Sequence, residues 1–169
     1  MQKELYEMYS PRFYALCRRY TSDEESANEI LADGFIAVFS EIGKYRSEGS
    51  FEGWMQTIFL RKAIKFFRDD HRRQQTFKEL DSTEFDGEYA DIAAQIDIRD
   101  AMVAALQRLP DEERVAFNLV AVEDYSLAEA SEEIGIPIST VKSRYYRALQ
   151  TVREFLTKRL GEDFVKKYR

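Results

Sequence analysis

The sequence predicts an all-α protein in which a flexible acidic linker joins two small helical domains. Gly and Pro are scarce, at 7 and 3 of 169 residues, and the alternation of apolar and polar residues that is typical of strands barely occurs. Apolar residues recur at helical spacing through residues 1–75 and again through residues 98–169. Residues 76–97 hold one lysine against seven acidic residues, a composition that buries too little apolar surface to become ordered.

Three helices are expected in the N-terminal domain, residues 1–75, which we interpret as a helical bundle. The first is expected to kink or restart at Pro11. It carries apolar side chains at helical spacing at Tyr6, Tyr9, Phe13, Leu16 and Tyr20. The second covers residues 26–42, with Ser22 or Asp23 as its N-cap. A loop follows, and a long helix over residues 51–71 completes the domain.

The C-terminal domain, residues 98–169, begins with a helix whose end is marked by a proline. Apolar side chains from Ile98 onward follow helical spacing, and the helix is expected to stop before Pro110, because the residue before a proline disfavours helical backbone. Asp111 is placed to cap the next helix.

Residues 126–141 have the pattern of a helix-turn-helix. A short helix is followed by Gly135, which tolerates the positive φ of a helix end, and by Pro137, which prevents simple continuation. Ser139 then suits the N-cap of a second helix. Two helices across a short glycine turn are the arrangement that reads duplex DNA, so the domain is interpreted as a DNA-binding one.

The second helix of this motif separates into two faces at about 100° per residue. One face is apolar and consists of Val141, Tyr145, Ala148, Leu149 and Val152. The opposite face is polar and consists of Lys142, Ser143, Tyr146, Arg147 and Gln150, with Arg144 on the flank. An ordinary solvated face is the alternative, but the turn chemistry favours contact with phosphates and base edges. The expected DNA-binding set is Thr140, Lys142, Ser143, Arg144, Tyr146 and Arg147.

Composition argues against catalysis and against a membrane protein. The net charge of −6 resides entirely in residues 76–97, so it does not exclude nucleic acid as a partner. One His and one Cys cannot build a usual zinc site, and no Gly-rich phosphate loop occurs, so we expect no metal, no cofactor and no enzymatic activity. Cys17 is best read as a core residue. No segment is long and apolar enough to span a membrane, which favours a cytoplasmic protein.

The C-terminal sequence resembles the minus-35-reading domain of extracytoplasmic-function (ECF) sigma factors of the sigma-70 family. The resemblance rests on the Leu-Pro-acidic run at residues 109–113, on Ser126 and Gly135, and on the run Thr-Val-Lys-Ser-Arg at residues 140–144 followed by Arg147-Ala148. Response-regulator output domains share a similar helix-turn-helix, so this motif alone indicates a transcription factor.

The N-terminal domain resembles the part of the same family that binds polymerase and melts DNA. Residues 27–35 are similar to the helix that docks on the clamp helices of the largest polymerase subunit, although Ala32 and Gly34 depart from the family form. Its outward face, the implied clamp-binding surface, consists of Glu29, Asp33, Ile36 and Ser40. The long third helix resembles the promoter-melting segment.

The implied minus-10 DNA-binding set spans a loop and that long helix. It comprises Tyr45, Arg46, Ser47, Ser50, Trp54, Arg61, Lys65, Arg68, Arg72 and Arg73. Arg61 and Lys65 replace residues that are uncharged or acidic in the family form, and with Arg68 they make a basic stripe near aromatic side chains, which suits an opened DNA strand. For Trp54, simple core packing is the favoured alternative.

The resemblance as a whole implies a sigma factor that directs promoter-specific transcription initiation. The implied partners are core RNA polymerase, through the clamp helices of the largest subunit and the flap of the second-largest, promoter DNA, and an anti-sigma factor that could hold the chain at the inner membrane. Free or inhibited forms are expected to be compact, with the basic stripe or the DNA-reading face partly covered. Two alternatives stay open: a helix-turn-helix regulator that does not bind core polymerase, and an interaction protein without a DNA role.

Overall fold

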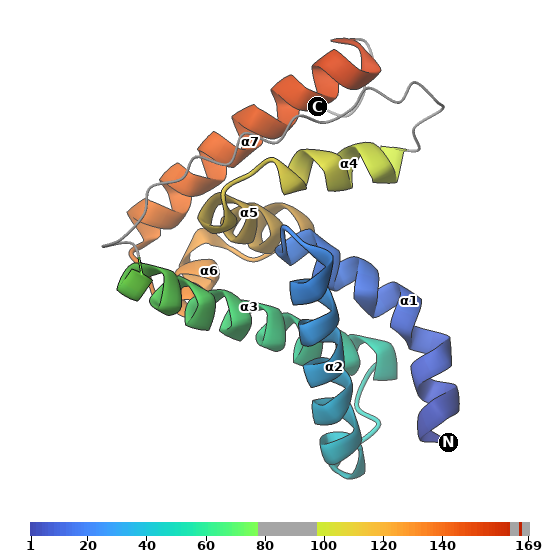
Figure 1. Cartoon of the computed structure of the whole chain (residues 1–169). Helices are drawn as coiled ribbons and strands as arrows, with labels where there is room; N and C mark the ends of the chain where they lie inside the picture. The colour runs from blue at the N-terminus through green and yellow to red at the C-terminus, as the bar shows by residue number, and fades with distance from the viewer. Residues whose placement is uncertain (78–97, 163–165, 167–169) are drawn as a thin grey trace.

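The computed structural model describes the backbone of residues 1–77, 98–162 and 166, and the side chains of these residues apart from 71–77. Every regular element in these ranges is a helix, which confirms the all-α prediction (Figure 1). The N-terminal half holds α1 (Gln2–Tyr20), α2 (Glu24–Glu41), a 3-10 turn (Ile42–Lys44) and α3 (Phe51–Phe77). The C-terminal half holds α4 (Ile98–Gln107), α5 (Asp111–Phe117), a π-helical turn (Asn118–Val122), α6 (Leu127–Ile134) and α7 (Ile138–Leu160). The predicted linker lies outside the described residues, except that its first two residues extend α3.

The ends of the first two helices show where local sequence signals decide the backbone. The carboxylate of Asp23 accepts a hydrogen bond of 2.7 Å from the backbone N–H of Ser26, so Asp23 is the N-cap of α2. The helix therefore starts two residues before the predicted Ser26. Of the two expectations for Pro11, a kink or a restart, the restart is wrong, because α1 continues through this position. Pro11 is exposed, so water can reach the carbonyl that loses its helical partner.

An aromatic cluster holds the three N-terminal helices together. The ring of Phe13 from α1 stacks on the ring of Phe59 from α3 with centroids 4.2 Å apart, and Phe35 from α2 meets Phe59 edge-on at 5.2 Å. Gly34 lies directly beneath the Phe59 ring, and a Cβ atom at this position would overlap that ring. The departure of Gly34 from the family form is therefore explained by the close approach of α2 and α3.

Arg114 joins α4 to α5 in the C-terminal half. Its side chain is almost fully buried, and it donates hydrogen bonds to the carbonyl oxygens of Leu106 (2.8 Å) and Leu109 (2.6 Å). It also pairs with the Asp111 carboxylate at 2.6 Å. The prediction that Asp111 caps the helix is wrong: Pro110 is the N-cap residue and Asp111 is already helical. The carboxylate is instead drawn to the buried guanidinium of Arg114.

The predicted helix-turn-helix is present as α6 and α7. Ser126 and Glu129 form a capping box at the start of α6, with bonds of 3.1 and 2.8 Å, and Gly135 ends the helix at φ +77°. The prediction of Ser139 as the next N-cap is wrong. α7 begins at Ile138 because Pro137, with φ fixed at −58°, is preset for helix entry and its carbonyl accepts the first helical bonds.

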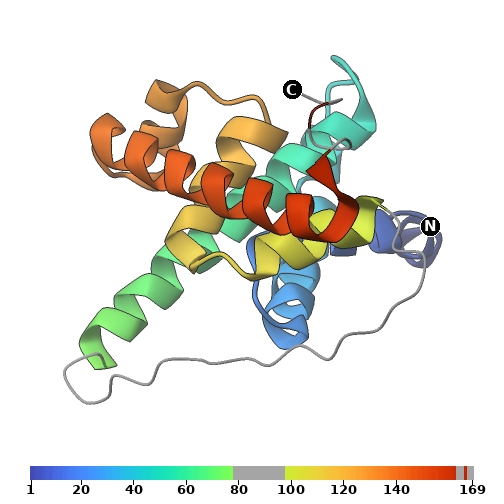
Figure 2. The ribbon, with the colours of Figure 1, turned by 90° about the horizontal axis from the view of Figure 1, so that it is seen from above.

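The two halves pack against each other rather than standing apart. α5 and α6 lie between α7 and the N-terminal helices α1 and α3 (Figure 1), and α7 lies across α4 and α5 (Figure 2). One apolar core runs from Phe13, Phe59 and Ile64 into Val115 and Leu119 of the C-terminal half. The residues described thus form a closed arrangement, which confirms the expectation of a compact form.

A buried polar cluster, here called the Glu123 node, crosses this contact. The Glu123 carboxylate, with a side chain only 5% exposed, accepts bonds from Arg19 (3.1 Å) and from Gln56 (2.9 Å) of the N-terminal half. The side-chain amide of Asn118 donates to the backbone carbonyl of Arg19 at 2.6 Å. Burial, and next to it the negative charge of Glu123, raise the pKa of Tyr20 well above its ordinary value, so this phenol stays neutral. The π-helical turn presents both Asn118 and Glu123 to the N-terminal half.

Gly34→Ala is expected to lower the free energy of unfolding by about 1–3 kcal/mol, because the added methyl group overpacks the ring of Phe59. The control is Gly43→Ala, where a Cβ atom meets nothing within 4 Å. Urea denaturation followed by circular dichroism measures both variants. If Gly34→Ala is as stable as Gly43→Ala, then the close approach of α2 to α3 does not constrain the N-terminal half.

Candidate nucleic-acid interface

The exposed face of α7 has the composition that the sequence predicted. Lys142, Ser143, Tyr146 and Arg147 are exposed, while Val141, Tyr145, Ala148, Leu149 and Val152 are buried or half-buried against the rest of the C-terminal half. Tyr146 is 55% exposed although it is a large aromatic residue. Thr140 is half-buried, and its carbonyl accepts a bond of 3.0 Å from the Ser143 hydroxyl. The face thus offers two cations, hydroxyls and a ring to an external partner.

The two arginines of α7 differ in how they are held by acidic residues of α5. Arg144 pairs with Glu112 at 2.7 Å and its side chain is only 16% exposed. Arg147 pairs through its Nε with Glu113 at 3.0 Å and its side chain is 62% exposed. Arg144 therefore serves mainly to join α7 to α5, whereas most of Arg147 remains accessible. The sequence analysis included the two glutamates only in the acidic run at residues 109–113 and did not predict these contacts.

The loop before α3 is shaped by an aromatic cluster. The Tyr45 hydroxyl donates to the carbonyl of Gly49 at 2.7 Å, and the Tyr45 ring lies 5.2 Å from that of Phe51 and 5.3 Å from that of Trp54. Trp54 is half-buried, so it combines packing with a partly accessible ring. The predicted contact residues Arg46, Ser47 and Ser50 are exposed around the cluster. Ser47 adopts a positive φ of 57°, which turns the loop sharply.

The basic stripe on α3 is exposed. Arg61, Lys65 and Arg68 all reach solvent, while the aromatic and small side chains predicted opposite them, Phe59, Ala63, Phe66 and Phe67, are buried or half-buried. The expectation that the closed form covers this stripe or the α7 face is therefore wrong, because α3 uses its apolar side to meet the C-terminal half. Arg72 and Arg73 belong to α3, but their side chains lie outside the described residues.

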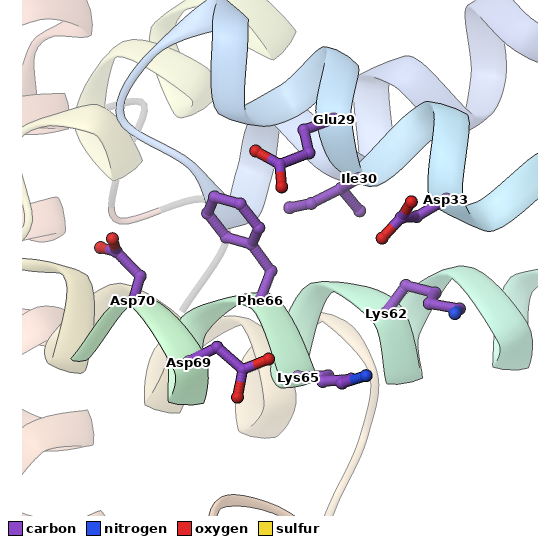
Figure 3. Close-up of a pocket in the computed structure, with 8 residues that line it drawn as sticks. All are labelled: Glu29, Ile30, Asp33, Lys62, Lys65, Phe66, Asp69 and Asp70. Carbon is purple, nitrogen blue, oxygen red and sulfur yellow. The ribbon is translucent and has the colours of Figure 1, made fainter. Parts of the chain in front are cut away.

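A groove of about 190 Å³ between α2 and α3 brings the predicted clamp and DNA residues together. Figure 3 shows Glu29 and Asp33 projecting from α2 toward α3, where Lys62 and Lys65 lie, with the ring of Phe66 between the helices. Ile30, Asp69 and Asp70 complete the lining. The groove therefore has charges of both signs, and Lys62 is a member that the sequence analysis did not identify.

The other two clamp candidates lie further along α2, outside this groove. Ile36 is 66% exposed, an unusual setting for a large apolar side chain, whereas Ile30, Phe35 and Val38 of the same helix are buried. Ser40 is exposed, and its hydroxyl donates to the carbonyl of Ala37 at 2.9 Å. The face that the spacing predicted is thus accessible over its whole length.

Within the described residues, no group of three or more His, Cys, Asp and Glu side chains is placed to hold a metal ion. Cys17 is fully buried, and burial raises the pKa of its thiol to about 12, so it is a protonated core residue as expected. No helix in the described part of the chain is long and apolar enough to cross a membrane.

Comparison with known proteins matches both halves of the chain to one family. The family models for Sigma-70 region 2 and Sigma-70 region 4 match residues 5–73 and 99–152. The ECF RNA polymerase sigma factor SigE of Mycolicibacterium smegmatis is 29% identical over 166 residues, which cover 94% of this chain and 63% of the relative. The corresponding sigma factor SigW of Bacillus subtilis is 25% identical over 163 residues, or 90% of this chain and 87% of the relative.

A solved structure supports the same fold. The sigma factor RpoE from Bartonella quintana, determined in complex with the anti-sigma factor NepR, superposes with a TM-score of 0.55 at 23% identity over 92% of this chain and 96% of that one. A helix-turn-helix regulator that acts without polymerase is disfavoured, because such a protein has no reason to carry region 2 beside region 4. With regions 2 and 4 in the family's order and relatives of one kind over nearly its full length, this chain belongs to the sigma-70 family as an ECF RNA polymerase sigma factor.

Proposed function

We propose that the chain binds core RNA polymerase and directs it to promoters. In this proposal α7 recognises the minus-35 element, and the loop before α3 together with the basic stripe on α3 binds the minus-10 element. The observation that carries this proposal is the exposure of two separate surfaces of basic and aromatic side chains, one in each family region, on a single chain. Its catalytic partner is the polymerase, so the chain supplies no chemical step of its own. Its place of action is the cytoplasm, where the polymerase works.

At the minus-35 element, α7 enters the major groove as the second helix of a helix-turn-helix does. Lys142 and Ser143 are suited to phosphate oxygens, which set the register of the helix on the duplex. Arg147 and Tyr146 carry long, exposed side chains on this face, so we assign them to base edges.

At the minus-10 element, the loop after α2 receives a base from the opened strand. Extruding a base costs a few kcal/mol of lost stacking and pairing, and stacking on an aromatic side chain returns about 1–3 kcal/mol per base. The cluster of Tyr45, Phe51 and Trp54 supplies aromatic surface next to the exposed loop. Arg61, Lys65 and Arg68 then follow the strand backbone along α3.

The contact with polymerase uses the outward face of α2. Glu29 and Asp33 provide negative charge and Ile36 provides an accessible apolar side chain, a combination that suits the clamp helices of the largest subunit. The C-terminal half would meet the flap of the second-largest subunit. An anti-sigma factor is the expected inhibitor, as in the complex of the Bartonella relative with NepR.

The closed arrangement must open for both elements to be read at once. The two elements lie about 25 base pairs apart, which is about 85 Å along B-form DNA. A folded chain of this length has a radius of gyration of only about 15 Å. Binding to polymerase therefore has to separate the two halves, and the contacts to be broken include the Glu123 node and the shared apolar core.

Glu123→Ala should shift the free chain toward the open form. The change leaves Arg19 and Gln56 without their shared partner, at a cost of about 1–3 kcal/mol, enough to raise the open fraction about 5- to 150-fold. Small-angle X-ray scattering should report a larger radius of gyration with unchanged helical content by circular dichroism. The exposed Glu132→Ala on α6 is the control. Identical scattering from both variants would show that the node does not hold the halves together.

Transcription from a promoter with minus-35 and minus-10 elements tests the proposed function directly. Core polymerase should make promoter-specific transcripts only when this chain is added. The double variant Lys142→Ala and Arg147→Ala should reduce them at least tenfold, since each lost base or phosphate contact costs about 1–3 kcal/mol. Arg153→Ala, an exposed arginine further along α7, is the matched control. Tight binding of the free chain to DNA with no transcripts would favour a regulator, and full activity of the double variant would favour an interaction protein.

Reversing the charge of the α2 face should weaken polymerase binding without unfolding the chain. The variant Glu29→Lys with Asp33→Lys changes two exposed side chains, but both line the groove opposite Lys62 and Lys65, so like-charge repulsion should cost about 1 kcal/mol of stability, and circular dichroism checks that the variant is folded. A titration of core polymerase with fluorescently labelled chain should show at least a tenfold loss of affinity. Glu41→Lys, exposed at the end of α2, serves as the control. Equal affinities of both variants would mean that Glu29 and Asp33 do not contact the polymerase.

A further inference from the structure

We propose that Glu113 is a positioning residue for DNA recognition. By holding the Nε of Arg147, it aims the outer edge of that guanidinium at a base pair. Arg147 then recognises guanine rather than phosphate. This inference rests on the proposed function, because it assigns a role within the minus-35 contact.

The geometry separates the two ends of the Arg147 side chain. The Nε atom lies 3.0 Å from Oε1 of Glu113, whose side chain is 16% exposed, so the inner end of the guanidinium is ion-paired with α5. The side chain as a whole is 62% exposed. The two terminal nitrogens of Arg147 form no hydrogen bond or ion pair with another of the described residues. They are therefore free to donate a parallel pair of hydrogen bonds outward.

The helix that carries Glu113 is held rigidly in the fold. Glu113 belongs to the first turn of α5, where the positive end of the helix dipole favours a carboxylate. The residues that follow it, Val115 and Phe117, are buried in the two apolar cores, and α5 packs along α7. A long surface arginine normally loses rotamer freedom when it binds; Arg147 is already partly ordered before DNA arrives.

The pairing also changes what Arg147 recognises. Next to the Glu113 carboxylate its positive charge is largely neutralised, which weakens its attraction to phosphate and its contribution to counterion release. Its hydrogen-bond donors are untouched, and two parallel donors match the O6 and N7 acceptors of guanine in the major groove. Glu113 therefore lowers the general affinity of Arg147 for DNA and increases its discrimination between bases.

The neighbouring pair provides an internal comparison. Glu112 also forms an ion pair with an arginine of α7, but through a terminal nitrogen of Arg144, whose side chain is only 16% exposed and so presents little to DNA. The two adjacent glutamates of α5 thus have different consequences: one fixes a reading residue and the other attaches α7 to α5. Glu112→Ala is accordingly the matched control for Glu113→Ala, because it removes a similar ion pair from the same turn.

The test uses holoenzyme assembled from core polymerase and the full chain. Binding is measured to a set of promoters carrying each of the four base pairs at every minus-35 position, at several salt concentrations. Arg147→Ala first identifies the position at which discrimination is lost. Glu113→Ala should lower discrimination at that same position about tenfold. It should also steepen the slope of log binding constant against log salt concentration by up to about one, because an unpaired arginine becomes a phosphate contact.

Glu113→Gln separates orientation from charge. Its side-chain oxygen can accept a hydrogen bond from the Nε–H group, so discrimination should be retained while the salt dependence steepens. This variant also decides the matter if Glu113→Ala does not fold. Glu112→Ala should change neither property at the Arg147 position, and Glu113→Ala should have no further effect on discrimination when Arg147 is already alanine.

Two outcomes overturn the inference. Discrimination and salt dependence of Glu113→Ala equal to those of the wild type would show that the ion pair does not position Arg147. Loss of discrimination in Glu112→Ala equal to that in Glu113→Ala would reduce both glutamates to a structural role. A wild-type holoenzyme with no dependence on the minus-35 sequence would instead refute the proposed function itself, and the inference with it.

Discussion

The guanidinium of Arg114 bonds to the carbonyls of Leu106 and Leu109 and to the Asp111 carboxylate in a setting almost closed to water. A buried charge is tolerated only when its donors are satisfied, so these bonds fix the turn between α4 and α5. The position of α5 follows from that turn. Its first residues hold the arginines of α7, its middle enters the shared core, and the π-helical turn after it presents Glu123 to the N-terminal half.

Short-range patterns predicted the faces of the helices well. The division of α7 into an apolar side with Val141 and Val152 and an exposed side with Lys142 and Arg147 follows from helical periodicity alone. The turn at Gly135 and the cap at Asp23 are equally local. Ser139 and Asp111 failed as caps because each has a proline just upstream, Pro137 two residues and Pro110 one residue before, and that proline already sets the entry of the helix.

Contacts between distant segments could not be predicted in this way. Nothing near Gly34 in the sequence shows that the ring of Phe59 will lie on it, and nothing near Glu113 shows that Arg147 will be its partner. Both depend on how helices cross, which periodicity does not specify. The same limit applies to the groove between α2 and α3, where the negative charge of Asp33 on α2 shares the groove with the positive charge of Lys62 on α3.

The burial of Cys17 determines how the chain responds to oxidants. The thiolate is the form that reacts, and a thiol whose pKa is raised to about 12 inside the aromatic core is protonated and shielded at any physiological pH. It is the only cysteine of the chain, so no internal disulfide can form. The folded chain therefore offers oxidants no reactive thiol, so a thiol-based response to oxidants would have to come from a second molecule that senses the oxidant and then binds or releases this chain.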